Sequence, residues 1–413
     1  MQKRRLATCL VAALLVLVLS AVSPAARADV ITDWNETGVT AVVAGGLNGL
    51  AMSRAMAMIH AAMHDAVNGV ERRYTSYGAD IKAPPGASRE AAASAAAYTV
   101  LSRLLWLQTP VFDAMLEASL ARIADGPAKT DGLAVGKAAA EKILALRAND
   151  GANGSAVYTH RTGLGMYQPT PPVNPPPVMP HWATVRPFTL KSPDQIPVKG
   201  PAPYDSAEFA RDFTEVKLMG AKNSPARTRE QTETARFWSI SGIVTDNAAA
   251  RQVAIKKATS VTDNARIFAL LNMAGADAYI ACWEAKYRLH HWRPVTAIRN
   301  AAAIGNPNLV ADPNWEPLLV TPAHPEYPSG HTCYAGATER VSQELLGDDH
   351  GFTLTFPAMR LTRTYQSFAQ AGKEVIDARV WAGIHFRSSD EHGYELGRRV
   401  ADHALQTTLR PVP

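Results

Sequence analysis

Apolar residues recur along this chain at the three- to four-residue spacing of helices, in long segments that contain few breakers. In the first half this pattern predicts helices over residues 40–70, 88–106, 110–125 and 131–146. In the second half it predicts helices over residues 206–219, 228–239, 263–289, 330–346, 359–381 and 390–406. The alternation of apolar and polar residues that marks a strand is scarce. The pattern therefore predicts an all-α fold.

A proline-rich stretch separates the two sets of predicted helices. It runs over residues 169–204 and holds 12 of the 28 prolines of the chain. No helix survives that density of proline, so we expect a long extended connection. The sequence thus predicts two helical bundles, an N-terminal one over 29–168 and a C-terminal catalytic one over 205–413 that carries an oxyanion pocket.

The N-terminus has the features of a targeting segment. Basic residues within the first five positions, an apolar run over 10–19 and small residues up to Ala28 predict a signal peptide over 1–28. Its removal takes away four basic residues and no acidic one, so the formal charge falls from +5 to +1. We therefore expect a secreted or periplasmic protein without a nucleic-acid partner and, after cleavage, without a membrane partner.

Three segments of the C-terminal half concentrate cations, histidines and a helix start. They run from Lys286 to Arg293-Pro, over Pro-Ser329-Gly330-His331, and from Arg379 to His385. Lys286 and Arg293 are two helical turns apart, so both can face one place. Ser329 and Gly330 precede a predicted helix, whose N-terminal amides attract anions. Together these groups suit a tetrahedral oxyanion such as phosphate or vanadate.

The three segments resemble the signature shared by vanadium-dependent haloperoxidases, bacterial class A acid phosphatases and type-2 phosphatidic acid phosphatases. The resemblance implies vanadate as cofactor, with phosphate as the competing occupant. It implies that the equatorial oxygens of the bound oxyanion contact Lys286, Arg293, Ser329, Gly330 and Arg379. It also implies three catalytic groups: His385 as the vanadium ligand, or the nucleophile of a phosphatase, His331 as the acid–base group and Lys286 as the group that polarises bound peroxide.

The third segment departs from the family pattern in two places. Ala378 stands where the family has a serine, and the acid expected four residues after His385 comes one place late, as Asp390. One residue turns a helix by about 100°, so Asp390 is displaced from the direction of the imidazole. We therefore leave open whether Ser389, Asp390 or a bent helix start orients His385.

The residues flanking the motifs favour a peroxidase over a phosphatase. Trp283 lies one turn before Lys286, and His324 lies seven residues before His331. By resemblance, these two positions line the halide region of haloperoxidases. We expect a haloperoxidase that uses hydrogen peroxide to oxidise bromide or iodide, with chloride left open, and that halogenates a small organic acceptor. A phosphatase acting through a phosphohistidine and a non-catalytic oxyanion-binding protein are the alternatives, and a homo-oligomer stays open.

Two further pairs of residues lie close to the motifs. Cys282 and Cys333 each adjoin one, and in an oxidising compartment they could form a bridge or stay as thiols. His290 and His291 lie inside the spacer between Lys286 and Arg293. Packing or solvent exposure is the expectation for these two histidines.

Overall fold

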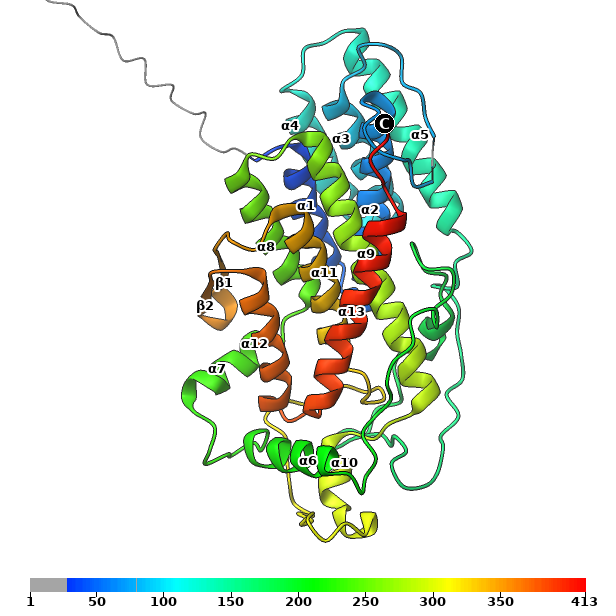
Figure 1. Ribbon diagram of the computed structural model, residues 1–413. Coiled ribbons are helices and arrows are strands. Elements are labelled where there is room, and N and C mark those ends of the chain that lie inside the picture. The colour runs from blue at the N-terminus through cyan, green and yellow to red at the C-terminus, as the bar shows by residue number, and fades with distance from the viewer. Residues whose placement is uncertain (1–27, 79) are drawn as a thin grey trace, which may run out of the picture.

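The computed structural model describes residues 28–78 and 80–413, so the predicted signal peptide lies outside the described residues except for Ala28. The described chain contains 13 α-helices and one two-stranded sheet, which confirms the predicted all-α class (Figure 1). Short 3-10 helices occupy Trp106–Gln108, Pro180–Thr184, Ala301–Ile304 and Pro357–Met359.

The N-terminal bundle contains five helices. These are α1 (Val30–Ala44), α2 (Gly49–Val70), α3 (Arg89–Leu104), α4 (Thr109–Leu120) and α5 (Pro127–Arg147). The single helix predicted over 40–70 was wrong, because the chain turns at Gly45-Gly46. Gly46 has a φ of +67°, and Asn48 then caps the next helix by accepting from the amides of Leu50 and Ala51.

The proline-rich connection contains no α-helix, as predicted, but it is firmly attached to the helices. Its carboxylate anchor is Asp277, which accepts bonds from the amides of Phe188 (2.6 Å), Thr189 (2.6 Å) and Leu190 (3.1 Å) and from the Thr189 hydroxyl (2.6 Å). Asp277 is fully buried on α9, so this contact fixes the connection against the core.

The C-terminal half contains eight helices and the sheet. The helices are α6 (Ala207–Met219), α7 (Arg229–Phe237), α8 (Gly242–Lys257), α9 (Val261–Leu289), α10 (Pro294–Arg299), α11 (Gly330–Leu346), α12 (Phe368–Trp381) and α13 (Arg387–Thr407). The strands β1 (Phe352–Phe356) and β2 (Leu361–Tyr365) pair antiparallel. The helix predicted over 359–381 therefore begins only at Phe368. Threonines paired across the two strands favour the hairpin over a longer helix.

The 29-residue helix α9 belongs to both bundles. It packs against α2 on the N-terminal side and against α11 and α13 on the C-terminal side, as its central position shows (Figure 1). One continuous core of buried side chains runs from Trp34 through Phe268 to Tyr334. Burial of this apolar surface on several faces of α9 joins the two bundles into one body.

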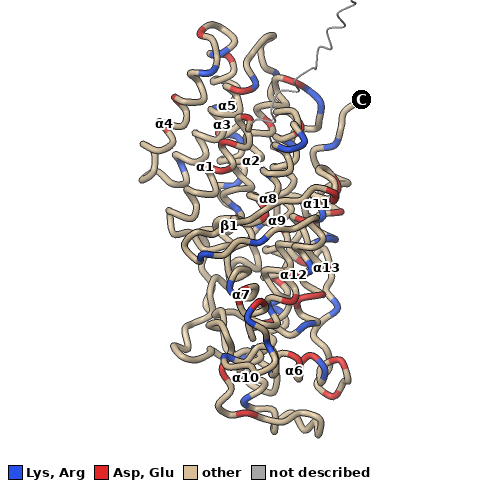
Figure 2. The backbone as a smooth tube through the Cα atoms, turned by 90° about the vertical axis from the view of Figure 1, so that its left-hand side faces the viewer, with Lys and Arg blue, Asp and Glu red and all other residues tan. Residues whose placement is uncertain are grey.

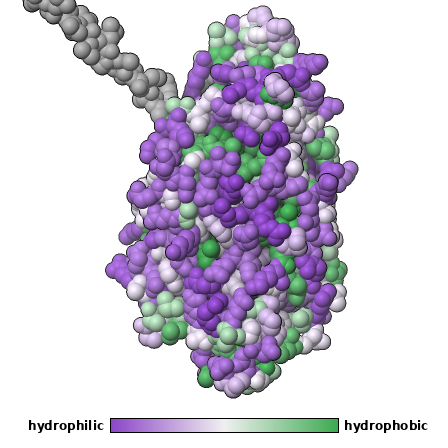
Figure 3. Space-filling view, viewed as in Figure 1, coloured by the Kyte–Doolittle hydropathy of each residue, from purple (hydrophilic) through white to green (hydrophobic). Residues whose placement is uncertain are grey.

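The surface carries mixed charge. Lysine, arginine, aspartate and glutamate alternate along the backbone (Figure 2), and the face seen in Figure 3 is largely hydrophilic with scattered apolar patches. Within the described residues, no helix combines the length and the apolar character that crossing a membrane requires.

Candidate active site

The three motifs meet at a cavity of about 320 Å³. It is lined by Asn48, Gly49, Leu50, Val178, Met179, Tyr279, Trp283, Pro322, His324, Gly330, His331, Arg379 and His385. These residues come from the start of α2, the proline-rich connection, α9, the loop before α11, α11 itself and the end of α12. The lining combines apolar side chains with the predicted histidines and Arg379.

His385 lies at the corner between α12 and α13 and is held from both ring nitrogens. Its Nδ1 lies 2.8 Å from Oε1 of Glu326, and its Nε2 lies 3.2 Å from Nη1 of Arg293. A guanidinium only donates, so Nε2 accepts and the proton is on Nδ1. Burial, reinforced by Arg293, lowers the pKa of His385 well below its usual range. The ring is therefore neutral, with a lone pair on Nε2.

Lys286 and Arg293 lie behind the cavity wall and support its loop. The Lys286 ammonium donates to the carbonyls of Pro325 and Glu326, both at 2.8 Å. Arg293 donates to the carbonyls of His324 (2.9 Å) and Ile384 (2.8 Å). Burial lowers the pKa of Lys286 to about 8. The structure thus brings both cations beside His385, with part of their hydrogen-bonding capacity used by backbone. The prediction that they share one helix face was wrong, because α9 ends at Leu289 and Arg293 is the N-cap of α10.

Several buried polar atoms at the start of α11 lack a partner within the described chain. They are Oγ of Ser329, Nε2 of His331 and Nε of Arg379. Ser329 occupies the N-cap position of α11 without a side-chain capping bond, so the first helical amides also remain available. Unpaired buried donors are costly unless a ligand satisfies them. A bound oxyanion fits this set, since its oxygens can accept from the Ser329 hydroxyl and the first amides of α11 and from the Arg379 guanidinium on α12.

His331 is the second predicted histidine of the site. It lies in the first turn of α11 and faces the cavity. Burial, followed by the charge of Arg379, lowers its pKa well below the usual range, while the carbonyl of Ile240 acts in the opposite direction. These two effects favour the neutral form of His331, and an anion bound beside it would raise its proton affinity.

The residue that orients His385 was missed by sequence reasoning. Asp390 and Ser389 instead lie near the start of α11, where the carbonyl of Ser389 accepts from the Ser329 amide at 3.1 Å. Burial raises the pKa of Asp390 well above its usual range, although Ser329 and Arg379 act to lower it. The carboxylate on His385 is Glu326, from the loop before α11. The only sequence signal for it was a glutamate in an otherwise uncharged stretch next to Pro-Ser-Gly-His.

Trp283 and His324 lie together on the cavity wall. Their ring centroids are 4.8 Å apart, and Nζ of Lys286 lies 5.8 Å from the Trp283 ring. His324 also lies 3.0 Å from Nη2 of Arg293 through Nδ1. Both candidate halide residues thus border the pocket beside the cations.

The cysteines next to the motifs are free and fully buried. Sγ of Cys282 lies 3.5 Å from the carbonyl of Pro328, one residue before Ser329. Cys333 lies two residues after His331 on α11. Both therefore pack behind the pocket as thiols, and the bridge that the sequence left open is not formed.

Known proteins share both the fold and the motif region. Residues 266–412 match the family model described as the second helical-bundle domain of vanadium chloroperoxidase. Vanadium chloroperoxidase of Curvularia inaequalis is 32% identical over 162 residues, which are 32% of this chain and 26% of that protein. The match therefore spans about a quarter of the length of the curated relative.

Two solved structures agree over nearly the whole chain. A bacterial vanadium-dependent iodoperoxidase superposes with a TM-score of 0.79 and 25% identity, covering 93% of this chain and 97% of that one. A bacterial vanadium-dependent chloroperoxidase in its apo form gives 0.72 at 18% identity, covering 87% and 93%. The fold and the pocket define a helical-bundle protein with an oxyanion site. Residues 266–412 are thus similar to a domain of vanadium chloroperoxidase, and the whole chain is similar in fold to bacterial vanadium haloperoxidases.

Proposed function

We propose that this protein is a vanadate-dependent haloperoxidase that uses hydrogen peroxide to oxidise bromide or iodide. The observation that supports it best is the position of His385, which lines the cavity with Nε2 as an acceptor, beside the unpaired Ser329 hydroxyl and Nε of Arg379. A lone pair on a buried imidazole is what a metal-centred oxyanion needs as its protein ligand.

The residues of this chain would hold the cofactor as follows. His385 would be the ligand through Nε2, while Ser329, the Gly330 amide and Arg379 would donate to the oxygens of the oxyanion. Lys286 and Arg293 would add positive charge from behind. Bound vanadate would supply the electrophilic, Lewis-acidic centre that activates peroxide. His331 would accept and return a proton at its Nε2, which is unpaired, since the residue lines the cavity.

The rest of the wall fits the two other reactants. Trp283 and His324 border the cationic side, where a halide ion would approach. Leu50, Val178 and Met179 form an apolar side that suits a small organic acceptor. The basic and apolar pattern of the N-terminus supports export to a secreted or periplasmic location.

The test compares bromination and iodination of a phenolic dye with hydrolysis of a phosphate monoester, each with and without added vanadate. We expect vanadate-dependent halogenation that needs peroxide and halide and is absent from His385→Ala. Phosphate-ester hydrolysis without halogenation would instead indicate a phosphatase acting through a phosphohistidine. Absence of both activities, with oxyanion binding retained, would indicate a binding protein.

A further inference from the structure

We infer that Glu326 is the positioning residue that holds His385 with its Nε2 toward the bound oxyanion. The inference rests on the proposed vanadate site and names a group of this chain that acts through His385 without touching the cofactor. In that role Glu326 takes the place that the sequence pattern assigned to the residues after His385.

The Glu326 carboxylate meets the His385 corner through one oxygen. Oε1 lies 2.8 Å from Nδ1 of His385 and accepts from the amide of Phe386 at 3.1 Å. The adjacent backbone and side-chain donors thus share one acceptor. This arrangement fixes both the position of the ring and its rotation, because either contact alone would leave the imidazole free to turn.

The direction of each hydrogen bond follows from the chemistry of the partners. Arg293 only donates, so Nε2 of His385 accepts from it. The remaining nitrogen then carries the proton and donates to the carboxylate. Glu326 and Arg293 therefore select the same tautomer from opposite sides of the ring. With an oxyanion bound through Nε2, the Nδ1 proton would remain, and Glu326 would be the group that accepts it.

The second carboxylate oxygen ties Glu326 to the first motif. Oε2 lies 3.0 Å from Nδ1 of His291, and the Glu326 amide donates to the His291 carbonyl at 2.8 Å. The Glu326 carbonyl accepts from Lys286 at 2.8 Å. Glu326 is itself fully buried, so its side chain has one conformation in which to act. The glutamate thus joins the segment that follows α9 to the corner that carries His385.

The test uses two Glu326 variants that retain different properties of the glutamate side chain. Glu326→Gln keeps an oxygen acceptor of the same shape but loses the charge. Glu326→Met keeps the volume and loses the acceptor. Glu284→Gln, which removes a carboxylate from the more exposed Arg288 pair on α9, is the matched control. Circular dichroism and thermal unfolding establish that each variant is folded.

Two measurements report on the role. In vanadate-free protein labelled with ¹⁵N-histidine, we expect a downfield Nδ1 proton of His385, assigned by its loss in His385→Gln. It should move upfield in Glu326→Gln and vanish in Glu326→Met. In calorimetric titration with vanadate alone, we expect affinity to fall about 10- to 100-fold in Glu326→Met and less in Glu326→Gln, with the control unchanged.

The possible results separate this inference from the proposed function. If the wild-type protein does not bind vanadate, the proposed function fails and the NMR result still tests the hydrogen bond. If the wild-type protein binds vanadate through His385 while both Glu326 variants bind it equally well, the positioning role is overturned and the proposed function stands. A Glu326→Met protein that keeps the downfield Nδ1 proton overturns the role as well.

Discussion

Nη1 of Arg293 lies 3.2 Å from Nε2 of His385, so the guanidinium donates to the nitrogen that we propose as the vanadium ligand. Both groups are buried, and the pKa of His385 is lowered in part by this cation. An incoming oxyanion can satisfy the two at once, since it offers an oxygen to the guanidinium and an electrophilic centre to the imidazole. We therefore expect a bound oxyanion to replace the contact that these two groups make with each other.

Replacement of Arg293 by lysine should weaken vanadate binding. The guanidinium reaches the carbonyls of His324 and Ile384 together with His385, and an ammonium on a flexible stem cannot match that fork. We expect a loss of at least ~10-fold in vanadate affinity, measured by calorimetry, from lost charge-assisted hydrogen bonds. Arg299→Lys, on α10 outside the cavity, is the control, and equal affinities for both variants would contradict the assigned role.

Replacement of His331 by alanine should separate binding from turnover. His331 faces the cavity with an unpaired Nε2 but is not the proposed vanadium ligand. Loss of an acid–base group typically costs about 10²- to 10⁴-fold in rate, so we expect halide oxidation to fall in that range. Vanadate affinity should change much less. His350→Ala, away from the cavity, should retain the wild-type rate; a His331→Ala enzyme of full activity would remove this histidine from the mechanism.

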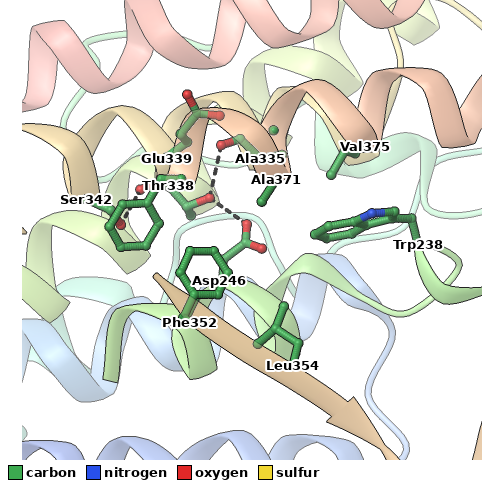
Figure 4. A pocket seen from close by; sticks show the side chains of 13 residues that line it. Trp238, Asp246, Ala335, Thr338, Glu339, Ser342, Phe352, Leu354, Ala371 and Val375 are labelled. Carbon is green, nitrogen blue, oxygen red and sulfur yellow. Dashed lines mark hydrogen bonds between the residues drawn. The ribbon is translucent and has the colours of Figure 1, made fainter. Parts of the chain in front are cut away.

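Two acids at a small second cavity should make the fold less stable as pH rises. Asp246 and Glu339 line this cavity beside α11, where Asp246 accepts from Thr338 (Figure 4). Burial raises their pKa values to about 6 and about 7. The folded protein therefore keeps these protons to higher pH than the unfolded chain does. The free energy of unfolding is therefore highest below about pH 4, the pKa of these carboxyls in the unfolded chain. It declines as the pH rises from there and levels off once the pH exceeds their pKa values in the folded protein.

Asp246→Asn tests this pH dependence. At pH 8 the amide avoids the cost of a buried charge and should stabilise the protein by on the order of 2 kcal/mol. Near pH 4 the native carboxyl is already neutral, so the gain should disappear. Thermal unfolding at both pH values measures the effect, with the exposed Asp125→Asn as control. A gain that is the same at pH 4 and pH 8 would rule out titration as its cause.

Removal of the Asp277 anchor should loosen the proline-rich connection. Asp277→Ala leaves three amides and a hydroxyl without their acceptor, and loss of a buried charged acceptor costs about 3–5 kcal/mol. We expect lower stability in urea and faster proteolysis within residues 169–204. Thr189→Val removes only the hydroxyl contact and should cost about 1 kcal/mol. Unchanged proteolysis of the Asp277→Ala protein would show that other contacts hold the segment.

The sequence predicted most helices because their apolar periodicity is local. It failed where the local pattern was weak or misleading. The helix α8 mixes apolar and polar residues around its axis and gives no clear apolar face, and the start of α12 was hidden by the hairpin before it. The break between α1 and α2 depends on Gly46, a breaker that a continuous apolar run obscured.

The candidate site was predicted as a set of residues but not as a set of contacts. Lys286 and Arg293 do lie near each other, but not by the predicted helical spacing, since α9 ends at Leu289 and Arg293 precedes α10. Helical spacing could not find Glu326, which reaches His385 across 59 positions of the chain. The same limit applies to Asp277 and the proline-rich segment. Partners that come together only through tertiary packing leave no periodic trace in the sequence.

The shared helix α9 has a consequence for dividing this protein. It begins at Val261, before the matched family domain begins at residue 266, and it carries Trp283 and Lys286 at its far end. A gene cut within the proline-rich segment would yield a C-terminal fragment with the α2-facing side of α9 bare. That fragment would lack Asn48 and Leu50 from the pocket wall. Attempts to express the catalytic half as a minimal enzyme should therefore supply the first five helices in trans.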